Sequence, residues 1–245
     1  MKKIVLIPTR LESKRLPGKA LLDVDGLPII VHTAKRSSLA KNVDEVYVCT
    51  DSEKIIDTCK EHNINTIKTG SNFLNGTERI ASVSSSFSDS LIIDVQGDEP
   101  LIKPFYIDSL IEAHINHQNN PEIIIPTIEV PYSSSDTIVR VVSSNSGRVM
   151  TLTRGNTPYR YKSEVSLVKK HVSVISFTSD ALLKYFKFNA SYLENIEDIE
   201  LLRAVENDMR VYTHKLDGNS FSVDVNDDYL KAKVAMIDDP IRKQY

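Results

Sequence analysis

The sequence predicts an α/β fold with three layers, in which a mostly parallel sheet carries helices on both faces. Three observations predict it. In the first half, short apolar runs rich in β-branched residues alternate with helical segments, as in repeated βαβ units. In the middle, extended segments joined by turn residues take their place. The 245 residues, 41% of them hydrophobic and 26% charged, suffice for a substantial core.

Strands and helices alternate through the first half of the chain. The expected strands are Ile4–Ile7, Glu45–Thr50, Thr66–Lys68 and Leu91–Val95. The expected helices are Pro28–Ser38, Glu53–His62, Gly76–Ser86 and Lys103–His117. Pro28 suits a first helical turn, where its missing N–H is not needed. Right-handed crossovers between parallel strands are therefore expected here.

The second half begins with extended segments and returns to helices. The expected strands are Ile123–Val130, Arg140–Ser144, Arg148–Thr153, Lys170–Phe177 and Arg210–His214. The expected helices are Ser179–Phe188, with Ser179 as its candidate N-cap, then Glu194–Asn207 and Asp227–Ile237. Asn145-Ser146-Gly147 is typical of a hairpin turn. The middle region is therefore predicted to be rich in β-structure.

Composition and charge exclude several classes of protein. A net charge of −3 argues against a nucleic-acid binder, which needs a basic footprint. Cys49 and Cys59 form neither a metal-binding pattern nor a disulfide framework. The apolar run after Met1-Lys2-Lys3 is too short for a signal peptide or a membrane span. We therefore expect a cytoplasmic protein with no membrane partner.

The first strand runs into a basic loop that contains Arg10, Lys14, Arg15 and Lys19. Ligands of α/β sheets bind beyond the carboxyl ends of the strands, so this loop suits a polyanion such as a nucleoside triphosphate. It contains neither a Walker motif nor G-x-G-x-x-G, so side-chain charges and backbone amides must hold the phosphates. A merely solvated basic loop is the alternative. Leu16-Pro17-Gly18 favours a shaped loop, because proline fixes φ and glycine allows close approach.

Two aspartates are candidate ligands for Mg²⁺, which takes one or two carboxylates together with phosphate oxygens and water. Asp98 follows the Leu91–Val95 strand, and Asp224 follows a short apolar segment. The alternative for Asp224 is a cap of the helix that begins nearby. Gly76 and Thr77 open another helix, whose free amides suit a base or phosphate edge; a simple helix start is the alternative.

Together these motifs resemble the sugar-acid cytidylyltransferases, and the CMP-Kdo synthetases (3-deoxy-manno-octulosonate cytidylyltransferases) in particular. Their opening motif is similar to Pro8-x-Arg10-x-x-Ser13-x-Arg15-Leu16-Pro17-Gly18-Lys19. Further matches are Gly76-Thr77-Glu78-Arg79-Ile80-Ala81, Gln96-Gly97-Asp98-Glu99-Pro100, the Leu193–Arg203 segment and Val223-Asp224. They occur in the family's order and span nearly the whole chain.

The resemblance implies a nucleotidyltransferase-type, Rossmann-like fold in a single domain over residues 1–245. Residues 1–120 would mainly bind CTP, residues 121–190 would form a β-rich region for sugar binding and dimerisation, and residues 191–245 would return to the core. The implied activity transfers CMP from CTP to the anomeric hydroxyl of a 3-deoxy-ulosonic acid, releasing pyrophosphate. The product would serve lipopolysaccharide or capsule synthesis, and a homodimer is expected.

The resemblance also assigns roles to residues. The implied catalytic residues are Arg10, Lys19 and Asp98. CTP would contact Pro8, Arg10, Arg15, Lys19, Gly76, Thr77 and Arg79. The sugar would contact Gln96, Arg154, His171 and Glu197, and Mg²⁺ would bind Asp98 and Asp224.

Departures from the family pattern cluster among the sugar-binding segments. The family's H-[LI]-G-[IV]-Y strand is present as His171-Val172-Ser173-Val174-Ile175, without the glycine and the tyrosine. The acceptor could therefore be Kdo, a modified Kdo or a related ulosonic acid. A cytidylyltransferase for a nine-carbon sialic-type acid is one alternative, although Gln96-Gly97-Asp98-Glu99-Pro100 argues against it. A non-catalytic nucleotide-binding protein is the other, against which Lys19, Asp98 and Asp224 argue.

Overall fold

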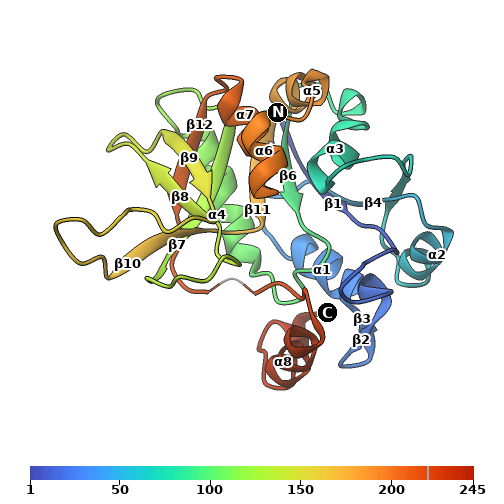
Figure 1. Cartoon of the computed structure of the whole chain (residues 1–245). Coiled ribbons are helices and arrows are strands. Elements are labelled where there is room, and N and C mark those ends of the chain that lie inside the picture. The colour runs from blue at the N-terminus through green and yellow to red at the C-terminus, as the bar shows by residue number, and fades with distance from the viewer. Residues whose placement is uncertain (220) are drawn as a thin grey trace.

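The computed structural model describes residues 1–219 and 221–245. Its main feature is a mixed sheet of ten strands with helices on both faces, which confirms the predicted fold class (Figure 1). The strands of this sheet are β1 (Lys2–Pro8), β4 (Glu45–Thr50), β5 (Thr66–Lys68), β6 (Ser90–Val95), β7 (Ile123–Pro131), β8 (Arg140–Ser143), β9 (Val149–Thr153), β10 (Leu167–His171), β11 (Val174–Thr178) and β12 (Val211–Lys215). The helices are α1 (Ile29–Ser38), α2 (Glu53–Glu61), α3 (Gly76–Ala81), α4 (Pro104–Ile115), α5 (Ser179–Lys187), α6 (Tyr192–Glu197), α7 (Leu202–Glu206) and α8 (Asn226–Ile237).

The strands of the first half are parallel and lie in the order β5-β4-β1-β6. Because side chains alternate along a strand, β1 contributes to the core on both faces of the sheet. Val5 and Ile7 pack on the face covered by α1, α2 and α4. Ile4 and Leu6 pack on the opposite face, beneath α3, α5 and α7. The four side chains are fully buried, as expected for an apolar run in the middle of a three-layer fold.

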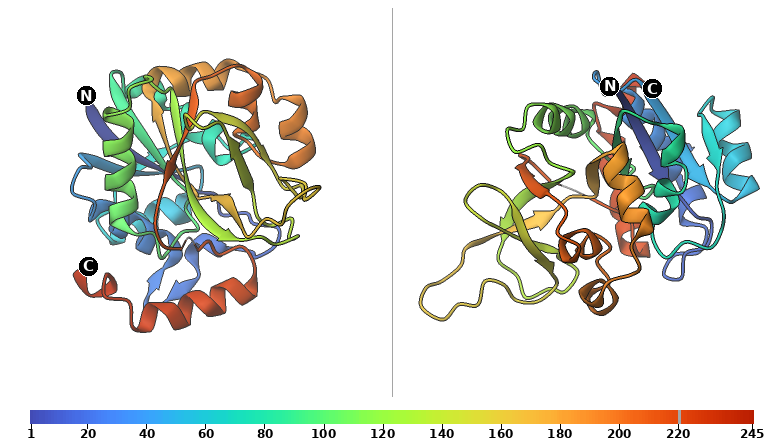
Figure 2. Two further views of the ribbon diagram at one scale, coloured as in Figure 1. Left: turned by 90° about the vertical axis from the view of Figure 1, so that its left-hand side faces the viewer. Right: turned by 90° about the horizontal axis from the view of Figure 1, so that it is seen from above.

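The second half extends the sheet with mainly antiparallel strands. β11 lies antiparallel to β6, and β7 is next to β11. β10, β8 and β9 continue the sheet, while β12 pairs in parallel with β7. The predicted hairpin turn lies between β8 and β9, where Gly147 has a φ of +84°. Figure 2 shows the loops of this region extending away from the parallel half.

The strand predicted at Lys170–Phe177 is wrong as a single element, because β10 and β11 are separate. His171 pairs with Thr127 of β7, and Ser176 pairs with Ile124. Between these two pairs lie four residues on the β10–β11 side (172–175) and only two residues of β7 (125 and 126). The regular strand pairing therefore cannot continue. Pro126 lies at this point and has no N–H to donate.

The helix predicted at Glu194–Asn207 is likewise two helices, α6 and α7. Asp198 ends α6 with a φ of +52°. Aspartate tolerates this left-handed conformation better than most residues, and a continuous helix cannot contain it. The short link 198–201 therefore runs between the two helices.

Two other predicted helix boundaries need correction. The helix expected at Gly76–Ser86 ends at Ala81, and a 3₁₀ turn follows at Ser84–Ser86. The hydroxyl of Ser84 donates to the carbonyl of Ala81, a bond by which serine competes with helical hydrogen bonding. The N-cap of α5 is Thr178 instead of Ser179, since the Thr178 hydroxyl accepts the N–H of Ala181 at 3.1 Å.

A small hairpin and α8 form a separate apolar cluster. The hairpin strands are β2 (Asp23–Val24) and β3 (Leu27–Pro28), which the sequence analysis does not anticipate. Asp25 and Gly26 form its turn with φ values of +50° and +79°. Val24 packs against Ala232 and Met236 of α8, together with Val223. This cluster fixes the segment that contains Asp224.

Candidate active site

Two loops meet beyond the carboxyl ends of the neighbouring strands β1 and β6. One follows Pro8 and the other follows Val95. A Cβ on Gly97 would lie 2.3 Å from Oγ1 of Thr9 and 3.0 Å from the carbonyl oxygen of Pro8. Only glycine allows this approach, so Gly97 lets the two loops lie against each other.

Lys19 lies between the two predicted metal ligands. Its ammonium donates to Oδ2 of Asp98 at 2.5 Å and lies 3.4 Å from Oδ1 of Asp224. Lys19 begins a 3₁₀ turn after Gly18, whose φ is +67°. The N–H of Val223 donates to the carbonyl of Asp98 at 2.9 Å and thereby places Asp224 beside it. The fold thus joins residues 19, 98 and 224 into one charged cluster.

The alternative interpretation of Asp224 as a helix cap is not supported. Its carboxylate pairs with Arg15 at 2.8 Å and with Lys19. The N-cap of α8 is Val225, and Asp228 supplies the capping carboxylate, because its Oδ2 accepts the N–H groups of Asp224 and Val225, each at 3.2 Å. The carboxylate of Asp224 is therefore directed toward the cluster.

The two carboxylates fit a Mg²⁺ ion that is completed by a phosphate. Asp98 and Asp224 are partly exposed, with side-chain exposures of 26% and 39%. Within residues 1–219 and 221–245, no group of three or more His, Cys, Asp or Glu side chains could hold a metal. Mg²⁺ commonly binds one or two carboxylates together with phosphate oxygens and water, so the two carboxylates are the usual number of protein ligands.

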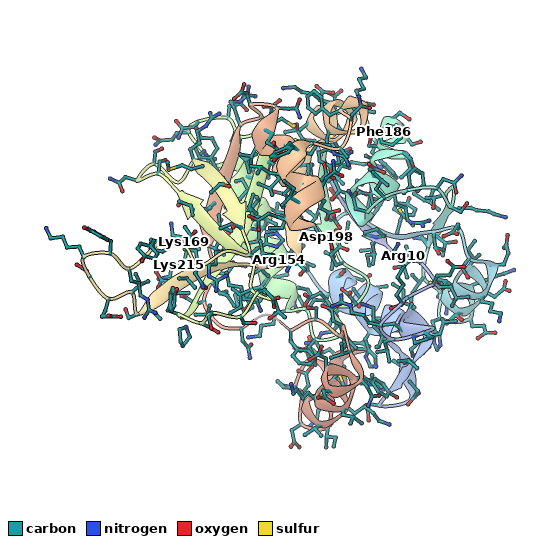
Figure 3. The ribbon with its side chains drawn as sticks, in the orientation of Figure 1. Arg10, Arg154, Lys169, Phe186, Asp198 and Lys215 are labelled. Atoms are coloured by element: carbon teal, nitrogen blue, oxygen red, sulfur yellow. The ribbon has the colours of Figure 1, made fainter. Side chains whose placement is uncertain are left out.

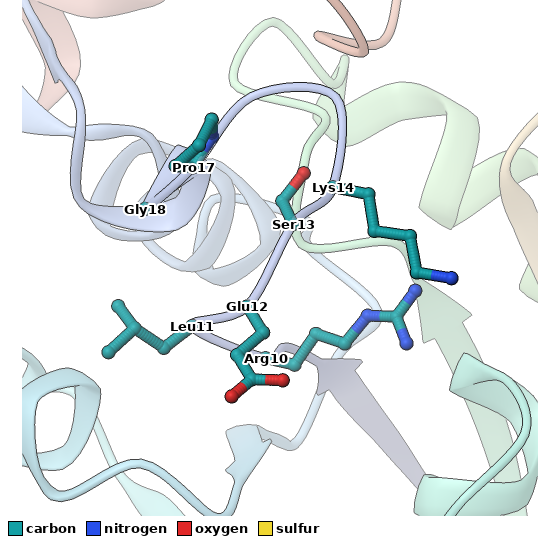
Figure 4. A pocket seen from close by; sticks show the side chains of 7 residues that line it. All are labelled: Arg10, Leu11, Glu12, Ser13, Lys14, Pro17 and Gly18. Carbon is teal, nitrogen blue, oxygen red and sulfur yellow. The ribbon is translucent and has the colours of Figure 1, made fainter.

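The basic loop after β1 encloses an open pocket of about 390 Å³. It is lined by Arg10, Leu11, Glu12, Ser13, Lys14, Pro17 and Gly18. Figure 4 shows the side chains of Arg10 and Lys14 extending in the same direction, with their cationic ends close together. The N–H of Lys19 donates to the carbonyl of Leu16 at 3.2 Å and closes the loop. The loop is therefore shaped, as predicted, and its cations suit phosphates.

Pro8, Gly76 and Gln96 come together from three parts of the chain. A Cβ on Gly76 would lie 3.0 Å from Cγ of Pro8 and 3.0 Å from Oε1 of Gln96. Gly76 begins α3, whose N-cap Asn75 accepts the N–H of Glu78 at 2.8 Å. Gly76, a predicted nucleotide residue, thus lies beside both Pro8 and the predicted sugar residue Gln96.

Thr77 and Arg79 are buried within the fold. The hydroxyl of Thr77 donates to Asp94 at 3.3 Å. The guanidinium of Arg79 donates to Oγ1 of Thr69 at 2.6 Å and pairs with Asp51 at 2.8 Å. These bonds tie α3 to the sheet and its loops. The assignment of both residues to CTP stays a prediction.

Arg154 and Glu197, predicted to contact the sugar, contact each other. The N–H and Nε of Arg154 donate to Oε2 and the carbonyl of Glu197 at 2.6 and 2.8 Å. Its NH2 donates to the carbonyl of Asp198 at 3.2 Å, and Figure 3 shows these two residues side by side. The left-handed Asp198 thus allows α6 to end against the Arg154 loop.

His171 is the last residue of β10. Burial lowers the pKa of His171 to about 4, with Lys170 as a second cause, so the imidazole is neutral at neutral pH. Its Nε2 has no hydrogen-bond partner among the described residues. Two residues later, the carbonyl of Ser173 accepts the N–H of Gln96 at 3.3 Å. His171 therefore has one free polar atom in the predicted sugar region.

Asp94, Glu99 and Glu200 are three acidic residues for which no role is predicted from the sequence. Asp94 is fully buried in β6, and Glu99 is 2% exposed beside Asp98. Burial, with the nearby charge of Asp98 as a second cause, raises the pKa of Glu99 to about 8. Asp94 carries the one available signal, since it is the only charged residue of the apolar run Leu91–Val95. Its partner Glu200 lies 106 positions away, which no local pattern reveals.

A fold of this kind with a basic loop and two converging carboxylates is typical of nucleotidyltransferases. The family model described as cytidylyltransferase matches residues 4–211. The chain therefore belongs to the cytidylyltransferase family.

Relatives and solved structures narrow this class. The 3-deoxy-manno-octulosonate cytidylyltransferase of Chloroherpeton thalassium is 33% identical, covering 96% of this chain and 98% of that protein. The Nitratiruptor sp. enzyme of the same name is 31% identical, covering 96% and 100%. A solved CMP:2-keto-3-deoxy-manno-octonic acid synthetase complexed with CTP is 27% identical, covers 96% and 98%, and gives a TM-score of 0.90. Within its family, the chain belongs with the 3-deoxy-manno-octulosonate cytidylyltransferases.

No helix in the described part of the chain is both long and apolar enough to cross a membrane.

Proposed function

We propose that this chain transfers CMP from CTP to the anomeric hydroxyl of 3-deoxy-manno-octulosonate or a closely related 3-deoxy-ulosonic acid. The observation that carries the proposal is the contact of Lys19 with Asp98 and Asp224 at the edge of the sheet. The names of the relatives, and CTP in the similar solved structure, support the donor and the acceptor class. The product would serve lipopolysaccharide or capsule synthesis.

The basic loop would hold the triphosphate. Arg10 lines the pocket and can bind two phosphate oxygens with its planar fork. Arg15 and Lys19 are bound to the two aspartates and lie close enough to share the negative charge of a phosphate. Pro8 and Gly76 would form the floor for the ribose or cytosine, because no side chain at residue 76 occupies that space.

The reaction forms one bond between phosphorus and a sugar oxygen and breaks one bond between phosphorus and a pyrophosphate oxygen. The anomeric hydroxyl releases its proton to solvent, its oxygen attacks the α-phosphorus in line, and the bond from that phosphorus to pyrophosphate breaks. Mg²⁺ bound by Asp98 and Asp224 would lower the pKa of the attacking hydroxyl and neutralise charge on the α-phosphate. Lys19 and Arg10 would stabilise the charge that moves onto the departing pyrophosphate. Catalysis would thus depend on positioning and charge neutralisation.

The sugar acid would lie on the Gln96 side of the site. His171 offers an unpartnered Nε2, and Gln96 offers an amide beside Gly76. Arg154 and Glu197, which bond to each other at the end of α6, would contact the sugar as well. Ser173 lies at the position where the family pattern has glycine. A serine side chain at this position could favour a sugar other than Kdo.

We also propose a homodimer formed through the mid-chain region. Met150 of β9 and Leu167 of β10 are 63% and 51% exposed there, and a second copy would cover such apolar side chains. Analytical ultracentrifugation tests this directly. A monomer at all protein concentrations up to the micromolar range would contradict it.

The reaction is tested by measuring pyrophosphate release from CTP with Mg²⁺ and a panel of acids that includes Kdo, an amino-Kdo and a sialic acid. We expect release with Kdo or its modified form. Preference for the sialic acid would favour the nine-carbon alternative, and no release with any acid would leave a nucleotide-binding protein.

The role of Asp98 is tested by Asp98→Asn, which keeps the shape but removes a charged ligand. We expect turnover to fall at least about a hundredfold with the fold preserved. The matched control is Asp89→Asn, at an exposed position before the opposite end of β6. Retained activity in Asp98→Asn would remove Asp98 from the metal site.

A further inference from the structure

Two carboxyl groups, those of Asp94 and Glu200, are linked to the candidate site through Thr77 and Gln96. Asp94 of β6 is fully buried, and Glu200 lies in the link between α6 and α7. Thr77 connects them, because its hydroxyl donates to Oδ2 of Asp94 at 3.3 Å and its N–H donates to Oε2 of Glu200 at 3.2 Å. The pair therefore joins β6, the start of α3 and the link 198–201.

Asp94 also fixes the side-chain amide of Gln96. Nε2 of Gln96 donates to Oδ1 and Oδ2 of Asp94 at 3.0 and 3.2 Å. The main chain of Gln96 is held as well, since its N–H donates to the carbonyl of Ser173 at 3.3 Å. With Nε2 directed at Asp94, Oε1 lies beside Gly76, 3.0 Å from where a Cβ would be.

Asp94 lies in an unusual electrostatic environment. Burial raises the pKa of Asp94 well above its ordinary value, and the charge of Glu200 acts in the same direction. Burial also raises the pKa of Glu200. The bonds that Asp94 accepts from the Thr77 hydroxyl and the Gln96 amide oppose this rise, because they favour the ionised form of Asp94.

The two bonds to Asp94 have consequences for what Gln96 can bind. Both oxygens of Asp94 accept from Nε2, so the NH₂ group of Gln96 faces inward. The amide oxygen is then the atom left for the ligand. An oxygen at this position accepts from a hydroxyl and repels a carboxylate. The geometry thus makes Gln96 selective for a hydroxyl of the acceptor.

We propose that Asp94 is a positioning residue for the acceptor, which holds the Gln96 amide so that Oε1 accepts a hydroxyl of the sugar acid. The inference rests on the proposed function for the identity of that ligand. It concerns a residue to which no contact with CTP or the metal is assigned. The Gln96 contact should therefore act on the acceptor, and the KM for CTP reports separately on the bond between Thr77 and Asp94.

Steady-state kinetics separate this role from a general loss of structure. Asp94→Ala removes both acceptor oxygens, and we expect the KM for the sugar acid to rise about tenfold, as for one lost hydrogen bond. The KM for CTP should stay within about twofold. Asp94→Asn keeps one acceptor oxygen and should recover most of the loss. An unchanged KM for the sugar acid in a folded Asp94→Ala variant would overturn the proposal.

A spectroscopic measurement tests the contact independently of activity. The side-chain NH₂ signals of Gln96, assigned by their loss in Gln96→Glu, should exchange slowly with water in the unsubstituted protein. They should remain so in Glu200→Gln, which leaves the Asp94 contact in place, and should exchange fast in Asp94→Ala. Fast exchange already in the unsubstituted protein would overturn the proposal even if the enzyme is active. Absent pyrophosphate release with slow exchange would instead overturn the proposed function and leave the contact standing.

Discussion

Lys19 stands where the nucleotide loop and the two candidate metal ligands meet, and its surroundings explain how few residues suffice for such a site. One ammonium contacts the carboxylates of Asp98 and Asp224, and Arg15 adds a second cation at the rim. Opposite charges are thus nearly balanced before a ligand binds. A triphosphate that arrives with a divalent cation would preserve this balance, which favours the exchange of partners within the cluster.

Gly76 offers a residue-scale test of how the nucleotide and sugar regions are joined. A Cβ in Gly76→Ala would lie 3.0 Å from both Cγ of Pro8 and Oε1 of Gln96, which is tighter than ordinary contact. We expect kcat/KM to fall about tenfold or more, because displacing either neighbour disturbs substrate positioning. Steady-state kinetics with both substrates measures this.

The matched control for that substitution is Gly70→Ala. The nearest neighbours of its new Cβ would be ring atoms of Phe73 at 3.6 Å, an ordinary van der Waals distance. We expect its kinetics to match those of the unsubstituted protein. Equal losses in the two variants would show that space at residue 76 has no special role.

Residues that carry their chemistry in a local motif could be predicted from the sequence. Lys19 and Asp98 are examples, since a basic loop and a carboxylate after a buried strand both indicate a site at the sheet edge. Asp94 and Glu200 could not be predicted as a pair. Their meeting depends on the break between α6 and α7, which local sequence did not reveal.

At the scale of elements, the regular runs were predicted well and the interruptions were not. β4 and β5 match their predicted bounds because apolar residues and turn residues delimit them clearly. The break between β10 and β11 depends on Pro126 of a different strand, so the sequence of β10 and β11 alone contains no sign of it. Long-range partners decide such boundaries.

The corrected cap of α5 gives a test at the element scale. Thr178→Ala removes the hydroxyl that accepts the N–H of Ala181, and we expect the free energy of unfolding to fall by about 1 kcal/mol. Ser179→Ala should change it by less than about 0.5 kcal/mol, because Ser179 is already within the helix, where alanine is favourable. Urea denaturation of both variants gives the comparison. A larger loss for Ser179→Ala would restore the cap predicted from the sequence.

For the whole molecule, one continuous sheet connects a parallel half to a mainly antiparallel half. β6 is the connection, because β1 lies parallel on one side of it and β11 antiparallel on the other. The alternation of strands and helices predicted the parallel half. It could not predict that β7 would pair with β10, β11 and β12, since apolar strands do not specify their partners over such distances.

His114 is a buried group where helix α4 packs on this sheet. It is 6% exposed, and its Nδ1 is 2.7 Å from Oγ of Ser176 in β11. Burial lowers the pKa of His114 to about 4 from 6.5, so the folded protein keeps the imidazole neutral. In the unfolded chain the same group takes up a proton once the pH falls below about 6.5. Its contribution to stability is therefore complete above pH 6.5 and is lost as the pH falls toward 4.

His114→Asn isolates this effect, because asparagine can still bond to Ser176 but does not titrate. The free energy of unfolding of the unsubstituted protein, minus that of the variant, should be constant above pH 7. Between pH 6.5 and 4 it should decrease by up to about 3 kcal/mol, since each pKa unit corresponds to about 1.4 kcal/mol. Urea denaturation at a series of pH values measures the difference, and other buried histidines cancel because both proteins contain them. If the free energies of unfolding of the two proteins change with pH in parallel, the packing of α4 on the sheet does not keep the His114 imidazole unprotonated.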